Sequence, residues 1–187
     1  VPIPLGFAGY LFFANRRLFF EFSLTFLLVN LLGFVIYYLH PAAPPWFVQQ
    51  HGLAFVPLTM GSTAGLARFD AFFGVPVFQS IYAKNANVFA AMPSLHSAYP
   101  VVVFFYALKN KTSVFNVFFL LIMLGIWFAA VYTSHHYLLD VLAGIAVALT
   151  GVGLLRLLLA RSAAFRRLLD YFVRATAPAA GPVVEAV

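Results

Sequence analysis

The sequence of 187 residues contains no cysteine and very few charged side chains. Without cysteine, a disulfide framework and a thiolate metal site are both excluded. Charged residues make up only 9% of the chain, whereas a typical soluble domain has about 25%. Hydrophobic residues make up 64%. So little polar surface cannot cover a water-soluble globule, and the composition therefore indicates an integral membrane protein.

Acidic residues are the scarcest charged class. There are five of them against 11 lysines and arginines, which leaves a formal net charge of +6. In a soluble protein this surplus would suggest a nucleic acid partner. Here the basic residues lie mostly in short segments between apolar runs, where they orient a protein in the membrane. We therefore expect a membrane environment and no nucleic acid partner.

Four apolar runs predict membrane-spanning helices, since about 20 apolar residues in a helix cross the hydrocarbon core. They cover about residues 18–39, 94–108, 114–132 and 137–160. Residues 41–91 are mixed in character and predict short helices and loops that lie at the surface or partly re-enter the membrane. The pattern thus predicts an all-α, polytopic transmembrane bundle over residues 1–175. Residues 176–187, rich in Ala and Pro, predict a disordered tail.

Basic clusters predict the orientation of this bundle. The clusters at 16–17, 109–111 and 161–167 would all be cytoplasmic, because loops on that side are enriched in Lys and Arg. Residues 161–174 alternate basic and apolar side chains, which is typical of an interfacial helix. The opposite, non-cytoplasmic face would then hold the mixed region 41–91, His96 and the turn at His135 and His136.

Three polar residues on that face predict catalytic chemistry. His136 and Asp140 are four residues apart at the start of a helix, so they share one face. A carboxylate beside an imidazole fixes its tautomer and raises its basicity. His96 begins a different helix, and one histidine could attack phosphorus while the other protonates the leaving oxygen. The alternative reading is that the histidines only cap helices or snorkel, but Asp140 inside an apolar run is costly and favours function.

A zinc site is the competing use of these histidines. The His-x-x-x-Asp spacing also suits metals, but the chain has no His-Glu-x-x-His pattern. We therefore expect no metal and no cofactor at this site.

Two motifs carry a resemblance to a known family. Pro93-Ser94-Leu95-His96 and His136-Tyr137-Leu138-Leu139-Asp140 resemble the Pro-Ser-x-His and His-x-x-x-Asp motifs of the type 2 phosphatidic acid phosphatase superfamily. Within it, the chain is most similar to the inositol phosphorylceramide synthases, the fungal aureobasidin-resistance protein and its bacterial relatives. Further matching strings are Pro41-Ala42-Ala43-Pro44-Pro45-Trp46 and Ala64-Gly65-Leu66-Ala67-Arg68-Phe69-Asp70. The resemblance covers roughly residues 41–151.

The resemblance implies a six-helix catalytic core, so that N-terminal helices would be missing from this chain. It also implies a ping-pong phosphotransfer without metal. His136 would be the nucleophile that forms a phosphohistidine, and Asp140 would orient it. His96 would protonate the departing diacylglycerol and later deprotonate the acceptor hydroxyl.

The chain departs from the phosphatases of this superfamily at their basic residues. The position six residues before His136, usually Arg, is Ala130, and the Lys and Arg-Pro of their first motif are absent. Other residues must then bind the substrate, and we expect this set: Arg68, Asp70, Lys84, Ser94 and His135. A phosphodiester carries less negative charge than a phosphomonoester and requires fewer cations. The departure therefore favours a transferase that acts on a phosphodiester lipid.

Three functions follow as hypotheses. The first is transfer of phosphoinositol from phosphatidylinositol to a ceramide-type acceptor, with release of diacylglycerol, at the periplasmic or lumenal face. A transferase of choline or ethanolamine phosphate is a close variant. The second is a lipid phosphate or pyrophosphate phosphatase on the same scaffold, and the third is a non-catalytic lipid transporter or scaffold.

Overall fold

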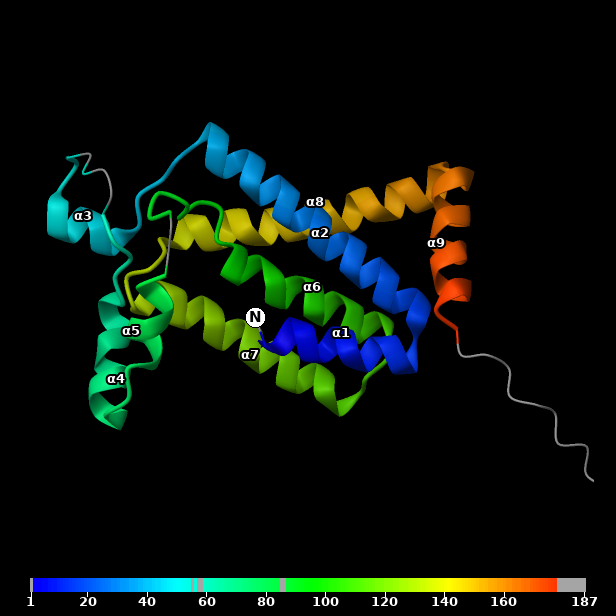
Figure 1. Ribbon diagram of the computed structural model, residues 1–187, viewed down its shortest axis with the longest axis horizontal. Coiled ribbons are helices and arrows are strands. Elements are labelled where there is room, and N and C mark those ends of the chain that lie inside the picture. Colours follow the sequence, from blue (N-terminus) through cyan, green and yellow to red (C-terminus); the bar gives the residue numbers. More distant parts are fainter. Residues whose placement is uncertain (1, 55, 57–58, 85–86, 178–187) are drawn as a thin grey trace, which may run out of the picture.

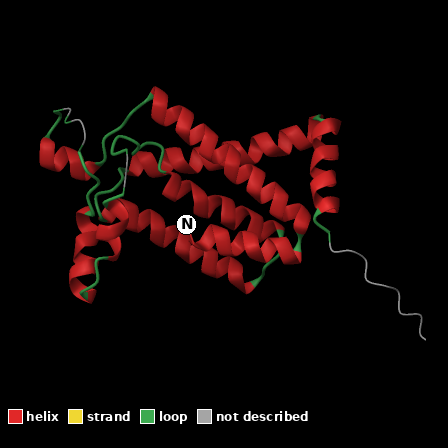
Figure 2. Ribbon diagram, in the orientation of Figure 1, coloured by secondary structure: helices red, strands yellow, loops and turns green. Residues whose placement is uncertain are grey.

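The computed structural model describes residues 2–54, 56, 59–84 and 87–177, and in this part of the chain helices joined by loops form the structure, without a named strand (Figure 2). The long helices are α2 (Arg16–Leu39), α6 (Leu95–Lys109), α7 (Val114–Tyr132) and α8 (Leu138–Arg161). The shorter ones are α1 (Pro2–Ala14), α3 (Pro45–His51), η1 (Ala64–Leu66), α4 (Ala67–Phe73), α5 (Val77–Tyr82) and α9 (Ala163–Ala175). The predicted all-α class is confirmed.

The long helices begin and end within two residues of the predicted spans. Local signals explain these bounds. The side chain of Asn15 caps α2 by accepting a hydrogen bond from the Leu18 N–H, and Pro41 follows soon after its end. Ser94 caps α6, as expected, by accepting from the Ser97 N–H.

Three helices, α2, α7 and α8, are long and apolar enough to cross a membrane. The fourth predicted span, α6, has only 15 residues. It is about 22 Å long at 1.5 Å per residue, which is shorter than a typical hydrocarbon core. It lies at the centre of the bundle against α2, α7 and α8, and Ala98, Val102 and Ala107 on it are fully buried.

The two ends of the bundle differ. Figure 1 shows α3, α4 and α5 gathered with their loops at one end and α9 crossing the other. The described parts of the mixed region 41–91 form short helices joined by loops, and Trp46, Phe47 and Val88 make a small core of their own within it. The predicted interfacial segment is helical as α9, and it packs on α2 and α8 through Leu169. Most of the predicted disordered tail lies outside the described residues.

Candidate active site

The two histidines of the sequence motifs lie close together at the end of the bundle that carries α3, α4 and α5. His96 is in the first turn of α6, and His136 lies two residues before α8. Their ring centroids are 6.2 Å apart. His96 is exposed, whereas the His136 side chain retains only 11% of its accessible surface. A reacting phosphoryl group between the rings would contact both.

A close contact between α6 and α8 brings the histidines together. The Ser94 N–H donates a hydrogen bond of 2.9 Å to the Asp140 carbonyl oxygen. One turn further along α8, Gly144 lies directly against Ser94, and a Cβ at position 144 would be 2.2 Å from the Ser94 carbonyl oxygen. Only glycine permits this approach, so the start of α6 is fixed to the start of α8 by backbone contact.

His136 and Asp140 lie side by side, as expected, at a distance typical of an ion pair. His136 Nδ1 lies 3.5 Å from Asp140 Oδ2, outside good hydrogen-bond geometry. The same Oδ2 accepts a hydrogen bond of 2.8 Å from the Tyr137 N–H, which caps α8. The carboxylate is 3% exposed and faces Nδ1, so a proton on Nδ1 is favoured. This tautomer leaves the Nε2 lone pair of His136 for chemistry.

The turn that carries the histidines is held by backbone hydrogen bonds. The N–H groups of His135 and His136 both donate to the Ala130 carbonyl oxygen, at 3.2 Å and 3.0 Å. Segments of the mixed region support the turn from outside. The Gly65 N–H donates to the Thr133 carbonyl oxygen and the Trp46 N–H to that of Ser134, each at 3.0 Å. Described segments of the mixed region therefore hold the turn that carries the two histidines.

His135 is buried beside His136. Its Nδ1 lies 2.9 Å from Thr133 Oγ1, and that hydroxyl donates its own proton to the Ala129 carbonyl oxygen at 2.7 Å. Nδ1 must therefore be the donor to Thr133. Burial lowers the pKa of His135, with the Ser62 backbone acting in the opposite direction. The ring packs against Tyr82, with centroids 4.7 Å apart, and is predominantly neutral at pH 7.

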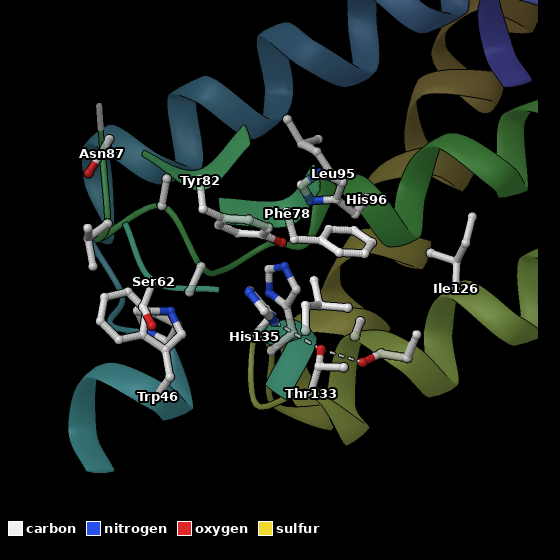
Figure 3. Close-up of a pocket in the computed structure, with 18 of the residues that line it drawn as sticks. Trp46, Ser62, Phe78, Tyr82, Asn87, Leu95, His96, Ile126, Thr133 and His135 are labelled. Atoms are coloured by element: carbon white, nitrogen blue, oxygen red, sulfur yellow. Dashed lines mark hydrogen bonds between the residues drawn. The ribbon is translucent and has the colours of Figure 1, made fainter. Parts of the chain in front are cut away.

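The three histidines line a cavity of about 530 Å³ between the bundle and the mixed region. Figure 3 shows its lining side chains, with His135 and Thr133 on one wall and Tyr82 and Phe78 across from them. Tyr37, Ser62 and Tyr99 add polar groups. None of the described residues that line this cavity is a lysine or an arginine.

Of the five residues expected to bind substrate, one lies at the cavity and the others do not line it. His135 lines the cavity. Arg68 is exposed and lies on the outer side of the turn, near Gln50 and Tyr132. The carboxylate of Asp70 accepts hydrogen bonds from the backbone N–H groups of Phe78 and Gln79, at 3.0 Å and 2.8 Å, and so caps α5.

Two of the five remain. Lys84 is exposed and does not line the cavity. Ser94 is fully buried, and its hydroxyl oxygen accepts from the Ser97 N–H and hydroxyl. Ser94 is thus the N-cap of α6, two residues before His96, and it does not line the cavity. Among the described residues, the geometry thus brings one of the five, His135, to the cavity wall.

Several lining residues carry no signal in the sequence. Tyr37 lies on α2 and donates a hydrogen bond of 2.7 Å to the Pro93 carbonyl oxygen, just before the α6 cap. Tyr82 and Ser62 come from the mixed region. Aromatic residues near a membrane surface are common, so only their position against the histidines distinguishes them. Ala130, where the phosphatases have Arg, also lines the cavity.

Comparison with known proteins agrees with this geometry. The model of the PAP2 superfamily matches residues 1–154. The phosphoinositol dihydroceramide synthase of Bacteroides thetaiotaomicron is 51% identical over 153 residues, which are 81% of this chain and 50% of that protein. The inositol phosphorylceramide synthase of Candida albicans is 34% identical over 133 residues, 70% of this chain and 28% of that protein.

The chain spans about half the length of the bacterial relative and less than a third of the fungal one. A search among solved structures found no significant match. The family match covers both histidine motifs, all of α6 and most of α8, and on that basis the chain belongs to the PAP2 superfamily, that of the type 2 phosphatidic acid phosphatases.

Proposed function

We propose that the protein transfers phosphoinositol from phosphatidylinositol to a ceramide-type acceptor and releases diacylglycerol. The observation that carries this proposal is the pair His96 and His136, 6.2 Å apart at a cavity without a lysine or arginine among its described lining residues. The relative of 51% identity is a phosphoinositol dihydroceramide synthase, which supports the choice of head group and acceptor.

In the first half-reaction, His136 Nε2 attacks the phosphorus of the donor lipid. An N–P bond forms, the P–O bond to glycerol breaks, and the proton of His96 passes to the departing glycerol oxygen. The Asp140 carboxylate, 3.5 Å from Nδ1, stabilises the positive charge that develops on the His136 ring. The products are diacylglycerol and a phosphoinositol group held on His136.

In the second half-reaction, the acceptor hydroxyl attacks the same phosphorus. Its proton passes to His96, an O–P bond forms, and the N–P bond to His136 breaks. Each histidine returns to its starting protonation state, so one group serves as acid and then as base. His96 is exposed to the cavity, which suits a residue that meets two different lipid oxygens in turn.

The charge of the cavity supports a phosphodiester donor. A phosphodiester has one negative charge, whereas a phosphomonoester carries up to two at neutral pH. The wall holds imidazoles, tyrosines and Ser62, while Arg68 and Lys84 lie outside it. Since the phosphatases use the position of Ala130 for an arginine, its absence here disfavours hydrolysis of monoesters.

The site is proposed to face the non-cytoplasmic side of the membrane, periplasmic in a bacterial inner membrane or lumenal in a eukaryote. The basic clusters expected to be cytoplasmic lie at the ends of α2, α6 and α8 away from the cavity, and α9 crosses that same end (Figure 1). The alternation of α6, α7 and α8 between the two ends is consistent with this choice.

A labelled-lipid assay tests the proposed reaction. The protein is incubated with phosphatidylinositol labelled in the head group, with and without ceramide, and the products are separated by thin-layer chromatography. We expect ceramide-dependent transfer that falls by at least about 100-fold in His96→Ala and His136→Ala. Phosphate release from phosphatidate, independent of any acceptor, would favour the phosphatase instead. Unchanged transfer in His136→Ala would contradict catalysis by this histidine, and no transfer or phosphate release by the wild type would favour the non-catalytic transporter.

A further inference from the structure

A second cavity adjoins the one at the histidines and is lined mainly by apolar side chains. It has a volume of about 150 Å³ and lies between α1, α6 and α7. Ile3 closes it on the α1 side, and Ile122 and Phe119 form its wall on α7. The phosphotransfer proposed above uses none of these side chains.

The lining residues form two facing rows along the helices. On α6 they are His96, Tyr99 and Val103, and on α7 they are Phe119, Ile122 and Ile126. Each row has the spacing i, i+3, i+7, which places its members on one face of a helix. Seven residues span about 10 Å along the axis. The cavity is therefore an elongated groove that runs parallel to the helices, as lipid chains do in a bilayer.

The groove begins at the catalytic acid. His96, Tyr99 and Ile126 line both cavities, whereas His136 and His135 line only the larger, more polar one. In Figure 3, His96 and Ile126 lie on one side of the catalytic cavity, and Trp46 and Asn87 lie on the other. A lipid held with its reacting oxygen at His96 would thus have the apolar groove on one side of that oxygen and the polar cavity on the other.

We propose that this groove holds a hydrocarbon chain of the lipid alcohol whose oxygen exchanges a proton with His96. The inference rests on the proposed function and adds the subsite that positions the lipid. Hydrocarbon gains about 25 cal/mol per Å² on leaving water, whereas a phosphate or inositol would lose hydrogen bonds among these apolar side chains. In a ping-pong reaction, the diacylglycerol part of the donor and the ceramide would occupy the groove in turn.

Filling the groove tests its role in transfer. Ile122→Trp places a large ring in the groove, and Leu121→Trp makes the same change at a neighbouring position that is 64% exposed. With long-chain ceramide we expect kcat/KM to fall by about ten-fold or more in Ile122→Trp and to stay within about two-fold of the wild type in Leu121→Trp. With an acceptor whose chains are too short to enter, Ile122→Trp should lose much less. Equal loss with short and long chains would overturn the proposal.

Because the chain has no cysteine, occupancy can be measured apart from catalysis. The variants Ile122→Cys and Leu121→Cys are alkylated in detergent with a hydrophobic maleimide, in the presence of long-chain ceramide, diacylglycerol or neither. At about ten times the dissociation constant, each lipid should slow alkylation of Ile122→Cys about ten-fold and leave that of Leu121→Cys unchanged.

These experiments distinguish a failure of the proposed transferase function from a failure of the proposed lipid groove. Protection of Ile122→Cys without any phosphoinositol transfer by the wild type would contradict the function and support the groove. Transfer by the wild type without protection of Ile122→Cys by either lipid would contradict the groove and leave the function standing.

Discussion

At the scale of single residues, Asp140 has two contacts that serve different purposes. Its Oδ2 accepts the Tyr137 N–H at 2.8 Å and lies 3.5 Å from His136 Nδ1. The first contact caps α8, and the second is proposed to orient the His136 ring and to stabilise the positive charge that develops on it during the reaction. A substitution that removes the negative charge of the Asp140 side chain but keeps an acceptor oxygen separates helix capping from the effect on His136.

Asp140→Asn should fold and cap α8, since asparagine also provides a carbonyl oxygen for the Tyr137 N–H. We expect kcat to fall by about 10² to 10⁴-fold, because the developing positive charge on His136 loses its carboxylate partner. Circular dichroism and thermal unfolding should remain close to those of the wild type. A transfer rate within a few fold of the wild type would show that the carboxylate charge is not needed for catalysis.

Ala130 is the second residue with a distinct consequence, because it lines the cavity where the phosphatases have arginine. Ala130→Arg would add a cation within reach of the anion. One hydrogen bond to a charged group is worth about 1.5–3 kcal/mol, so we expect phosphate release from phosphatidate to rise by about ten-fold or more. The matched control is Val131→Arg, at an exposed neighbour that does not line the cavity. Equal phosphate release by both variants would contradict an effect of position 130.

At the scale of the elements, the site depends on how closely α6 approaches α8. Gly144 lies against the Ser94 carbonyl, and the Ser94 N–H donates to the Asp140 carbonyl oxygen. These contacts join residues about 50 positions apart and fix the distance between His96 and His136. Trp127 on α7 adds a hydrogen bond of 3.1 Å from its indole N–H to the Ser97 carbonyl oxygen.

Gly144→Ala should therefore damage both stability and activity. Its Cβ would lie 2.2 Å from a backbone oxygen, and overpacking of this kind costs about 1–3 kcal/mol. Gly153→Ala is the control on the same helix, where no atom lies within 4 Å of the new Cβ, and it should be neutral or stabilising. Thermal unfolding in detergent and the transfer assay measure both effects. Similar behaviour of the two variants would mean that the contact at Gly144 is not limiting.

At the scale of the whole molecule, a buried acid holds the end of the bundle opposite the site. Glu21 on α2 is 5% exposed and pairs with Lys109 at the end of α6 and with Arg17, one turn earlier. Arg17 also pairs with Asp170 on α9 at 2.7 Å. This network of ion pairs joins α2, α6 and α9.

Glu21→Gln should destabilise that end of the bundle without changing the lining of the cavity at the histidines. It leaves two basic groups facing a neutral side chain, and removing one partner of a buried ion pair costs several kcal/mol. Because Lys109 and Arg17 are both about half exposed, we expect a smaller loss of about 1–2 kcal/mol. The unfolding temperature should fall, while KM for phosphatidylinositol stays unchanged. A variant as stable as the wild type would show that the network is not needed for stability.

The sequence alone determined the features that depend on neighbours along the chain. Apolar runs of spanning length, interrupted by Pro41, Asn110 and Arg161, marked the long helices. The spacing of His136 and Asp140 placed them on one face because a helix repeats every 3.6 residues. Composition required a membrane, since too few charged groups exist to face water.

Only the tertiary structure decided which side chains meet across elements. Arg68 and Lys84 lie outside the cavity, while Tyr37 and Tyr82 line it, and no local pattern separates these pairs. The segments around Gly65 and Trp46 are held against the turn by backbone hydrogen bonds, and this placement decides which side chains reach the cavity. Such bonds carry no side-chain signature, because every residue except proline has the same N–H donor. The meeting of His96 and His136 likewise depends on an approach of two helices that one glycine permits.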